Sequence, residues 1–219
     1  MDAARRRGVR VVGDGAHAIG SEYRGRKVGA MADATAFSFY VTKGITTGEG
    51  GMVTSHDESL IARIACLSLH GMSSGAWKRY SDRGSWYYEI LAAGYKCNMN
   101  DLQAAIGLCQ IERIDEFREA RTRIAEKYAA GLSAFDGVAV PGPCADGVHA
   151  WHLYPIQVDP AALRIDRDQF IRSLLAEGIG ASVHFIPIHY HPYFRSRLGY
   201  GVGAFPAAES YFARAVSLP

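Results

Sequence analysis

The most constraining feature of this sequence is an apolar run that ends in a single lysine. Residues 34–42 are mostly apolar, β-branched or aromatic, Lys43 follows them, and residues 44–51 contain four glycines. A strand that is buried in a core rarely finishes on a charged side chain, because a buried charge is costly unless it is paired. Lys43 therefore needs either a solvated loop or a chemical role.

Length and charge bound the class of protein. A chain of 219 residues can bury a sizeable core in one large or two small domains. The net charge of +2 is too small to indicate nucleic acid or an anionic membrane surface as a partner. No apolar run approaches the roughly 20 residues that cross a bilayer, and the basic start lacks the apolar segment of a signal peptide. We expect a cytoplasmic protein.

Hydrophobic periodicity predicts an α/β chain in two domains. The helix expected over 100–135 is long enough to bridge them and to bend, so the prediction is a domain over 1–135 and a smaller one over 136–219. Residues 71–99 look irregular and rich in aromatic side chains, which suits an interface and local packing about equally. The expected strands are 9–12, 37–41, 51–54, 149–158 and 181–188, with further helices near 57, from 166 to 178 and over 207–216.

Three side chains near expected strand ends suit a pyridoxal phosphate (PLP) site. Lys43 can form a Schiff base with the aldehyde, and we expect burial near the cationic ring to lower the pKa of this lysine. Asp14 can pair with the pyridine nitrogen, and Ser38 can hydrogen-bond the phosphate. On spacing alone a surface lysine remains the commoner interpretation. The glycines match neither G-x-G-x-x-G nor a P-loop.

Three motifs, in order along the chain, resemble one family. They are GDGAHAIG (13–20), FSFYVTK followed by GEGG (37–43 and 48–51), and GYKCNMNDLQAAIG (94–107). The chain resembles the DegT/DnrJ/StrS-type PLP-dependent nucleotide-sugar aminotransferases over its whole length. The resemblance implies PLP-dependent transferase fold type I, the aspartate aminotransferase-like fold, with a partial large domain and a small C-terminal α/β domain.

The resemblance also implies a role for each matching residue. Lys43 is the Schiff-base lysine that moves protons, and Asp14 is the partner of the pyridinium. His17 lies beside the cofactor, although a structural histidine is the alternative, and Ser38 contacts the phosphate. Asn98 reaches the cofactor of the other subunit, which implies a homodimer with a shared active site.

The chain departs from the family pattern in composition and in length. Gly13 and Gly15 stand where Glu and Ala are usual, Gly44 replaces Asn, and Cys97 replaces an aromatic residue or Arg. We expect the two glycines beside Asp14 to loosen its loop. The family's phosphate-binding Gly-Thr loop and its ring-stacking aromatic residue belong upstream of Met1, so the chain looks truncated there and slightly at its C-terminus.

The C-terminal part of the chain contains three closely spaced histidines, His184, His189 and His191. No acidic or cysteine ligand lies near them in sequence, so we predict no metal site. The resemblance places His184 in the sugar pocket. A hydrogen-bonded histidine inside the small domain is an equally good interpretation.

The predicted function is transamination of a nucleotide-linked keto sugar to an amino sugar in polysaccharide biosynthesis, with glutamate as amino donor. One alternative is a PLP-dependent sugar dehydratase, which Lys43 disfavours because such relatives carry histidine there. The other is a truncated, inactive fragment or a non-catalytic dimer partner, because half a sheet leaves strand edges exposed. The sugar, its ring carbon and the nucleotide are not encoded in these motifs.

Overall fold

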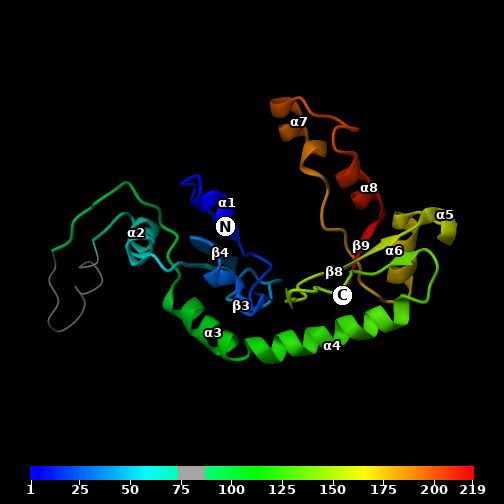
Figure 1. The fold of residues 1–219 in the computed structure, drawn as a ribbon, viewed down its shortest axis with the longest axis horizontal. Helices are drawn as coiled ribbons and strands as arrows, with labels where there is room; N and C mark the ends of the chain where they lie inside the picture. Colours follow the sequence, from blue (N-terminus) through cyan, green and yellow to red (C-terminus); the bar gives the residue numbers. More distant parts are fainter. Residues whose placement is uncertain (74–86) are drawn as a thin grey trace. The chain divides into compact units, whose positions relative to one another are not determined.

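The computed structural model of the chain describes residues 1–73 and 87–219, and it divides them into two compact units (Figure 1). Unit 1 comprises Met1–Glu119 and Ala145–Ala150, and unit 2 comprises Ala120–Cys144 and Trp151–Pro219. The expected domain boundary at residue 135 stays a prediction. Within the described ranges, no helix combines the length and the apolar character that a membrane span requires.

The central sheet of unit 1 has three strands in the order β1-β4-β5. The strand β1 (Val12–Asp14) runs parallel to β4 (Ala34–Ser38), with Asp14 opposite Ala36. The strand β5 (Gly51–Thr54), correctly predicted, pairs antiparallel with the other edge of β4. No strand among the described residues covers the outer edge of β1 or of β5.

Both predicted parallel strands were misplaced by about three residues. The strand expected at 9–12 begins at Val12, because the carboxylate of Asp33 accepts the Val11 N–H at 2.7 Å in place of a strand partner. The strand expected at 37–41 is β4, and it ends at Ser38. Beyond that point the chain turns, since the Phe39 N–H bonds the Gly50 carbonyl and the Lys43 N–H bonds the Tyr40 carbonyl.

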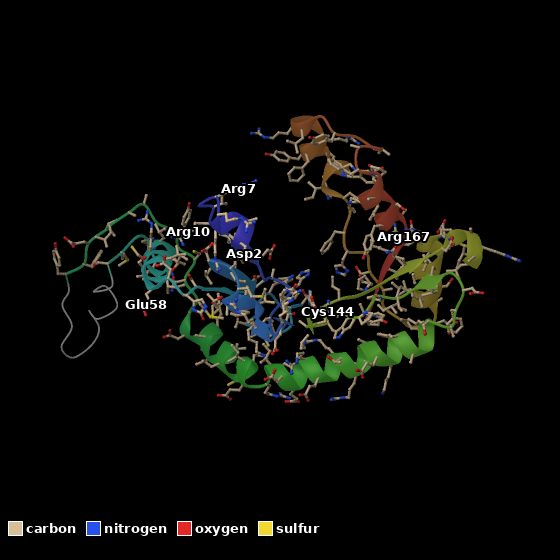
Figure 2. The ribbon with its side chains drawn as sticks, viewed as in Figure 1. Asp2, Arg7, Arg10, Glu58, Cys144 and Arg167 are labelled. Carbon is tan, nitrogen blue, oxygen red and sulfur yellow. The ribbon has the colours of Figure 1, made fainter. Side chains whose placement is uncertain are left out.

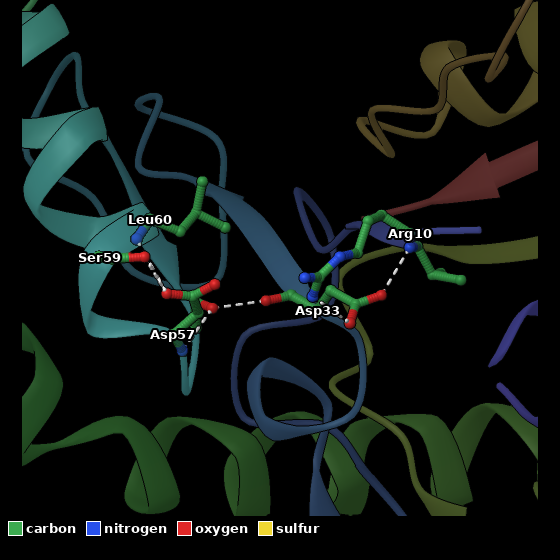
Figure 3. Close-up of polar contacts among 7 residues, drawn as sticks. Arg10, Asp33, Asp57, Ser59 and Leu60 are labelled. Atoms are coloured by element: carbon green, nitrogen blue, oxygen red, sulfur yellow. Dashed lines mark hydrogen bonds and ion pairs between the residues drawn. The ribbon is translucent and has the colours of Figure 1, made fainter. Parts of the chain in front are cut away.

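Asp33, directly before β4, and Asp57, directly before the next helix, flank the segment that contains β4 and β5 (Figure 3). Asp33 forms an ion pair of 3.4 Å with Arg10 and accepts the Val11 N–H. Asp57 caps α2 (Glu58–Ser68) by accepting hydrogen bonds from Ser59 Oγ at 2.6 Å and from the Leu60 N–H at 3.1 Å. These bonds lower the pKa of both carboxyl groups.

The glycine-punctuated segment after β1 forms a hairpin. The strands β2 (Glu22–Tyr23) and β3 (Arg26–Lys27) pair antiparallel, and β7 (Gly147–Val148) adds a third strand. Unit 1 also contains the short helices α1 (Asp2–Arg5) and η1 (Val28–Ala30). The described residues of 71–99 carry isolated bridges rather than strands, and the aromatic positions 77, 80 and 86 lie outside the described residues.

The long helix expected over 100–135 is two helices. The helix α3 (Asp101–Glu112) begins with a capping box, in which Asn100 accepts from the Gln103 N–H and Gln103 accepts from the Asn100 N–H. The chain leaves helical geometry at Arg113 and resumes as α4 (Ile114–Leu132), so the predicted bend is confirmed.

Unit 2 is built on a second antiparallel sheet in the order β6-β8-β9. These strands are β6 (Val138–Ala139), β8 (Tyr154–Val158) and β9 (Ala215–Leu218). Alternate residues of β8 are buried and join Val216 and Ala125 in the hydrophobic core. Therefore only the second half of the strand expected at 149–158 forms, where this alternation is strict.

The helix expected from 166 to 178 is α6 (Arg167–Ala176), which starts with a capping box formed by Asp166 and Gln169. Arg167, labelled in Figure 2, donates from Nη1 to the Phe212 carbonyl at 2.9 Å and thereby joins α6 to α8 (Pro206–Arg214). The remaining short helices are α5 (Pro160–Leu163), η3 (Ile188–Tyr190) and α7 (Pro192–Leu198).

One strand predicted for unit 2 was wrong, and one helix, α8, was predicted correctly except for its last two residues. The strand expected at 181–188 is reduced to one bridge between Ser182 and Ser217, and η3 begins at Ile188. The helix expected over 207–216 ends at Arg214, because the backbone from Ala215 onward pairs with β8. In both places, pairing with a segment distant in sequence decided the outcome.

Candidate active site

The parallel pairing of β1 and β4 brings two predicted site residues to one edge of the sheet. Asp14 and Ser38 are the last residues of their strands, and the carboxyl ends of parallel strands form the edge where ligands bind in α/β folds. The side chain of Asp14 is exposed, and its Oδ1 accepts the Ala16 N–H at 3.0 Å. Ser38 Oγ accepts the Tyr40 N–H at 3.4 Å.

Lys43 lies in the loop that leaves this edge, which we define as residues 39–50 and call the Lys43 loop. The lysine is half-buried, and its N–H closes a turn onto the Tyr40 carbonyl at 2.9 Å. Its neighbour Ile45 is only 2% exposed and Thr47 only 4%, so the loop is anchored by buried side chains on the C-terminal side of the lysine. Lys43 is therefore part of a packed turn, unlike a solvated surface lysine.

Gly15 is tightly packed, contrary to the expectation that it loosens the loop after Asp14. Its N–H donates to the Ala36 carbonyl at 2.8 Å, and a Cβ at this position would lie 2.8 Å from Thr35 Cγ2. There is no space for the alanine that the family pattern has here without a shift of Thr35 or Phe37. The glycine therefore fits a close approach of backbone to side chain.

The remaining predicted residues are His17, Asn98 and His184. His17 is exposed in the turn after β1. Asn98 precedes α3, and its side chain contacts Lys96 Nζ and donates to the Met99 carbonyl at 3.2 Å. His184 belongs to unit 2, where its Nδ1 lies 2.8 Å from Ser217 Oγ and its ring packs edge-on against Phe185.

A second histidine of unit 2, His189, is buried and hydrogen-bonded. The side chain of His189 is 7% exposed, and its Nε2 lies 2.8 Å from Glu209 Oε1. Burial by itself raises the pKa of Glu209. Hydrogen bonds from the Gly203 N–H, His189 and the Phe205 N–H together have a larger opposite effect, so the pKa lies below its ordinary value. His189 is therefore a structural residue, because its contact with Glu209 joins η3 to α8.

A pocket in unit 1 adjoins the segments that carry the candidate site. It has a volume of about 350 Å³, and its mainly apolar lining includes Ala18 and Phe37, the neighbours of His17 and Ser38 in sequence, but none of the predicted site residues themselves.

The donor set at this edge fits PLP. It offers a primary amine for the aldehyde, a carboxylate for the ring nitrogen and a hydroxyl for the phosphate. Lys43 would hold the aldehyde carbon, Asp14 the pyridine nitrogen and Ser38 the phosphate.

Comparison with known proteins indicates the same cofactor. The model of the DegT/DnrJ/EryC1/StrS aminotransferase family matches residues 1–219. The chain belongs to this family. Its fold is accordingly that of fold type I PLP-dependent transferases, and the family is PLP-dependent.

Individual relatives share about half of their length with the chain. The spore coat polysaccharide biosynthesis protein SpsC of Bacillus subtilis is 49% identical over 224 residues, which cover all of this chain and 58% of SpsC. The putative sugar aminotransferase Spr1654 of Streptococcus pneumoniae, in its PLP form, matches 96% of this chain with a TM-score of 0.84 and 32% identity. DesI, solved in the presence of its TDP-sugar product, matches the whole chain with a TM-score of 0.80 and 30% identity.

Coverage of the relatives is limited. The chain spans 57% and 58% of the length of two curated relatives that it matches, 52% of Spr1654 and 52% of DesI.

The sequence prediction did not include the residues that hold the Lys43 loop. Gln103 and Gln110 of α3 hydrogen-bond the backbone of Glu49 and Thr46, which are 54 and 64 residues away in sequence. The only local signal was the capping box at Asn100 and Gln103, and it predicts a helix start without indicating the loop contact.

Proposed function

We propose that this chain takes part in PLP-dependent transamination of a nucleotide-linked keto sugar to an amino sugar, with glutamate as the amino donor. The observation that carries the proposal is the turn after β4, in which Lys43 leaves the sheet edge that also holds Asp14 and Ser38. Bound PLP supplies an aldehyde that reacts with amines and a ring that accepts electrons. The TDP-sugar product in DesI and the name of SpsC support a nucleotide sugar and a role in polysaccharide biosynthesis.

Each proposed residue has a defined task. With PLP bound, the Lys43 amine would hold the aldehyde carbon and, when free, would accept and return the proton that moves during amine transfer. The Asp14 carboxylate keeps the ring nitrogen protonated, and the Ser38 hydroxyl donates to the phosphate. His17 lies beside the cofactor, and His184, oriented by Ser217, lines the sugar pocket.

We further propose that residues 1–135 are part of the PLP-binding large domain, that residues 136–219 form the small C-terminal domain, and that the protein is a cytoplasmic homodimer. The dimer would let Asn98 reach the cofactor of the partner. It is supported by the exposure of apolar side chains on and beside α3, where Leu102 is 79% exposed, Leu108 66% and Tyr95 71%. Large apolar side chains at such exposure are typical of faces that a partner covers.

The test is to incubate the purified chain with PLP, reduce it with borohydride and locate the modified residue by mass spectrometry. We expect modification of Lys43, with loss of both the modification and amino-sugar formation in Lys43→Ala. The exposed Lys127→Ala on α4 is the matched control and should keep both. Unchanged turnover in Lys43→Ala would refute the proposed role.

A second hypothesis, an inactive fragment or non-catalytic dimer partner, is favoured by the unpaired outer edges of β1 and β5 among the described residues. Absence of any PLP modification on the unchanged chain would support it. A dehydratase would instead release water and a dehydrated sugar that carries no amino group, which mass spectrometry of the sugar product distinguishes from an amino sugar.

A further inference from the structure

We propose that a stripe of three residues on α3, namely Gln103, Gly107 and Gln110, is a cradle that positions the Lys43 loop. These residues have the spacing i, i+4 and i+7, which places them on one face of a helix. The inference rests on the proposed function only insofar as Lys43 is the residue that binds PLP.

Each member of the stripe meets a different part of the loop. Gln103 donates from Nε2 to the Glu49 carbonyl at 2.9 Å. Gln110 accepts the Thr46 N–H on its Oε1 at 3.3 Å. Between them, Gly107 leaves room for the loop, since a Cβ there would lie 3.1 Å from Thr47 Cγ2.

The loop itself completes this arrangement with its own hydrogen bonds. The Phe39 carbonyl accepts both the Thr47 N–H at 3.0 Å and the Thr46 hydroxyl at 3.1 Å, and the Thr47 hydroxyl donates to the Glu49 carbonyl at 2.7 Å. The Glu49 carbonyl thus accepts from the loop and from α3 at the same time. The backbone on the C-terminal side of Lys43 is therefore fixed to the helix.

Gln103 also connects two segments of the candidate site. Its Oε1 accepts the Asn100 N–H at 3.2 Å in the capping box, while its Nε2 binds the loop. Asn100 lies two residues after Asn98, the predicted contact to the partner's cofactor. One side chain thus holds both the start of α3 and the lysine-bearing loop, which makes Gln103 a positioning residue.

The substitution Gln103→Glu separates these two tasks. A glutamate keeps the oxygen that accepts the Asn100 N–H, and Glu serves this position of a capping box as well as Gln does. It lacks the N–H that donates to Glu49, and it brings a carboxylate oxygen toward a carbonyl oxygen. The matched control is Gln169→Glu, the same change in the capping box of α6 in unit 2.

The experiment first measures hydrogen exchange over residues 39–50 of the full chain without PLP. We expect exchange of the loop amides to be about tenfold faster in Gln103→Glu, as for loss of one net hydrogen bond, and unchanged in Gln169→Glu. Gln110→Ala should also accelerate exchange at Thr46. Equal loop exchange in the unchanged chain, Gln103→Glu and Gln110→Ala would overturn the cradle.

The second readout is the rate at which borohydride traps PLP on Lys43, expressed as a ratio to the rate of trapping on the other lysines. We expect this ratio to fall by about tenfold or more in Gln103→Glu and to stay constant in Gln169→Glu, because a displaced nucleophile loses its productive orientation. Faster loop exchange with an unchanged ratio would overturn the positioning role. If even the unchanged chain traps no PLP, the proposed function fails, whereas the exchange comparison still decides whether α3 holds the loop.

Discussion

The carboxylate of Asp33 accepts a hydrogen bond of 2.7 Å from the backbone N–H of Val11, one residue before β1 begins. The backbone of Asp33 returns a second bond, from its N–H to the Val11 carbonyl at 3.0 Å. This pair of bonds sets the parallel register in which Asp14 lies opposite Ala36. The position of Asp14 at the sheet edge therefore depends on a residue at the opposite end of the strands.

Asp33 should make stability fall in acid. Its pKa is lowered from 3.8, first by the Val11 N–H and also by Arg10. A carboxyl group with a lowered folded-state pKa stabilises the fold above its ordinary pKa, and this contribution disappears as the pH falls through the folded-state value. We expect Asp33→Asn to lower the urea midpoint at pH 7 and to reduce its decline below about pH 4, measured by urea unfolding from pH 7 to pH 2.

The matched control for Asp33 is Asp2→Asn, which removes a carboxylate whose side chain is 83% exposed. It should retain the pH dependence of the unchanged protein. An identical acid profile for Asp33→Asn and the unchanged protein would contradict the role of this carboxylate.

Asp14→Asn should reduce turnover while leaving the loop intact. Asparagine keeps the oxygen that accepts the Ala16 N–H, but it lacks the negative charge that would hold the ring nitrogen protonated. We expect the rate of amino-sugar formation to fall by about 10²–10³-fold, the usual cost of one electrostatic contact to developing charge, with PLP still trapped on Lys43. The control Asp146→Asn, which removes an exposed partner of Arg24, should keep full turnover.

Ile156→Ala should destabilise unit 2 strongly. Ile156 is 1% exposed at the centre of β8 and belongs to the cluster with Val158 and Val216. Truncation leaves a cavity, so we expect a loss of about 2–5 kcal/mol in the free energy of unfolding, measured by chemical denaturation. Leu175→Ala, at a position that is 66% exposed, should change it by less than about 0.5 kcal/mol. Similar losses for the two variants would contradict this assignment of the core.

Tyr154→Phe should stabilise the protein or leave it unchanged. The Tyr154 hydroxyl is buried with no hydrogen-bond partner among the described residues, and burial raises the pKa of this phenol. Removal of an unpaired buried hydroxyl should increase the free energy of unfolding by up to about 1 kcal/mol. Tyr128→Phe is the opposite case, because that hydroxyl donates to the Pro219 carbonyl at 3.1 Å, and its loss should cost about 1 kcal/mol. A clear destabilisation by Tyr154→Phe would show that the hydroxyl has a partner.

Local sequence signals predicted the features that local physics controls. The bend near Arg113 and the strand β5 were predicted, and the hairpin of β2 and β3 and the capping box of α6 likewise follow from residues that are close together in the chain. The motifs around Asp14 and Lys43 likewise identified the family before any contact was known. Such signals work because caps, turns and periodic apolar faces are satisfied within a few residues.

The tertiary structure decided where strands end and what holds the candidate site. Residues 181–188 and 215–218 are similarly apolar in sequence, yet only Ala215–Leu218 forms a strand, because β8 offers it a continuous set of backbone partners. The register of β1 depends on Asp33, and the Lys43 loop depends on Gln103 and Gln110. The sequence alone determined that Lys43 ends an apolar run beside a glycine-rich turn. Whether that turn is held against a helix depends on hydrogen bonds between segments more than 50 residues apart, and no local pattern encodes them.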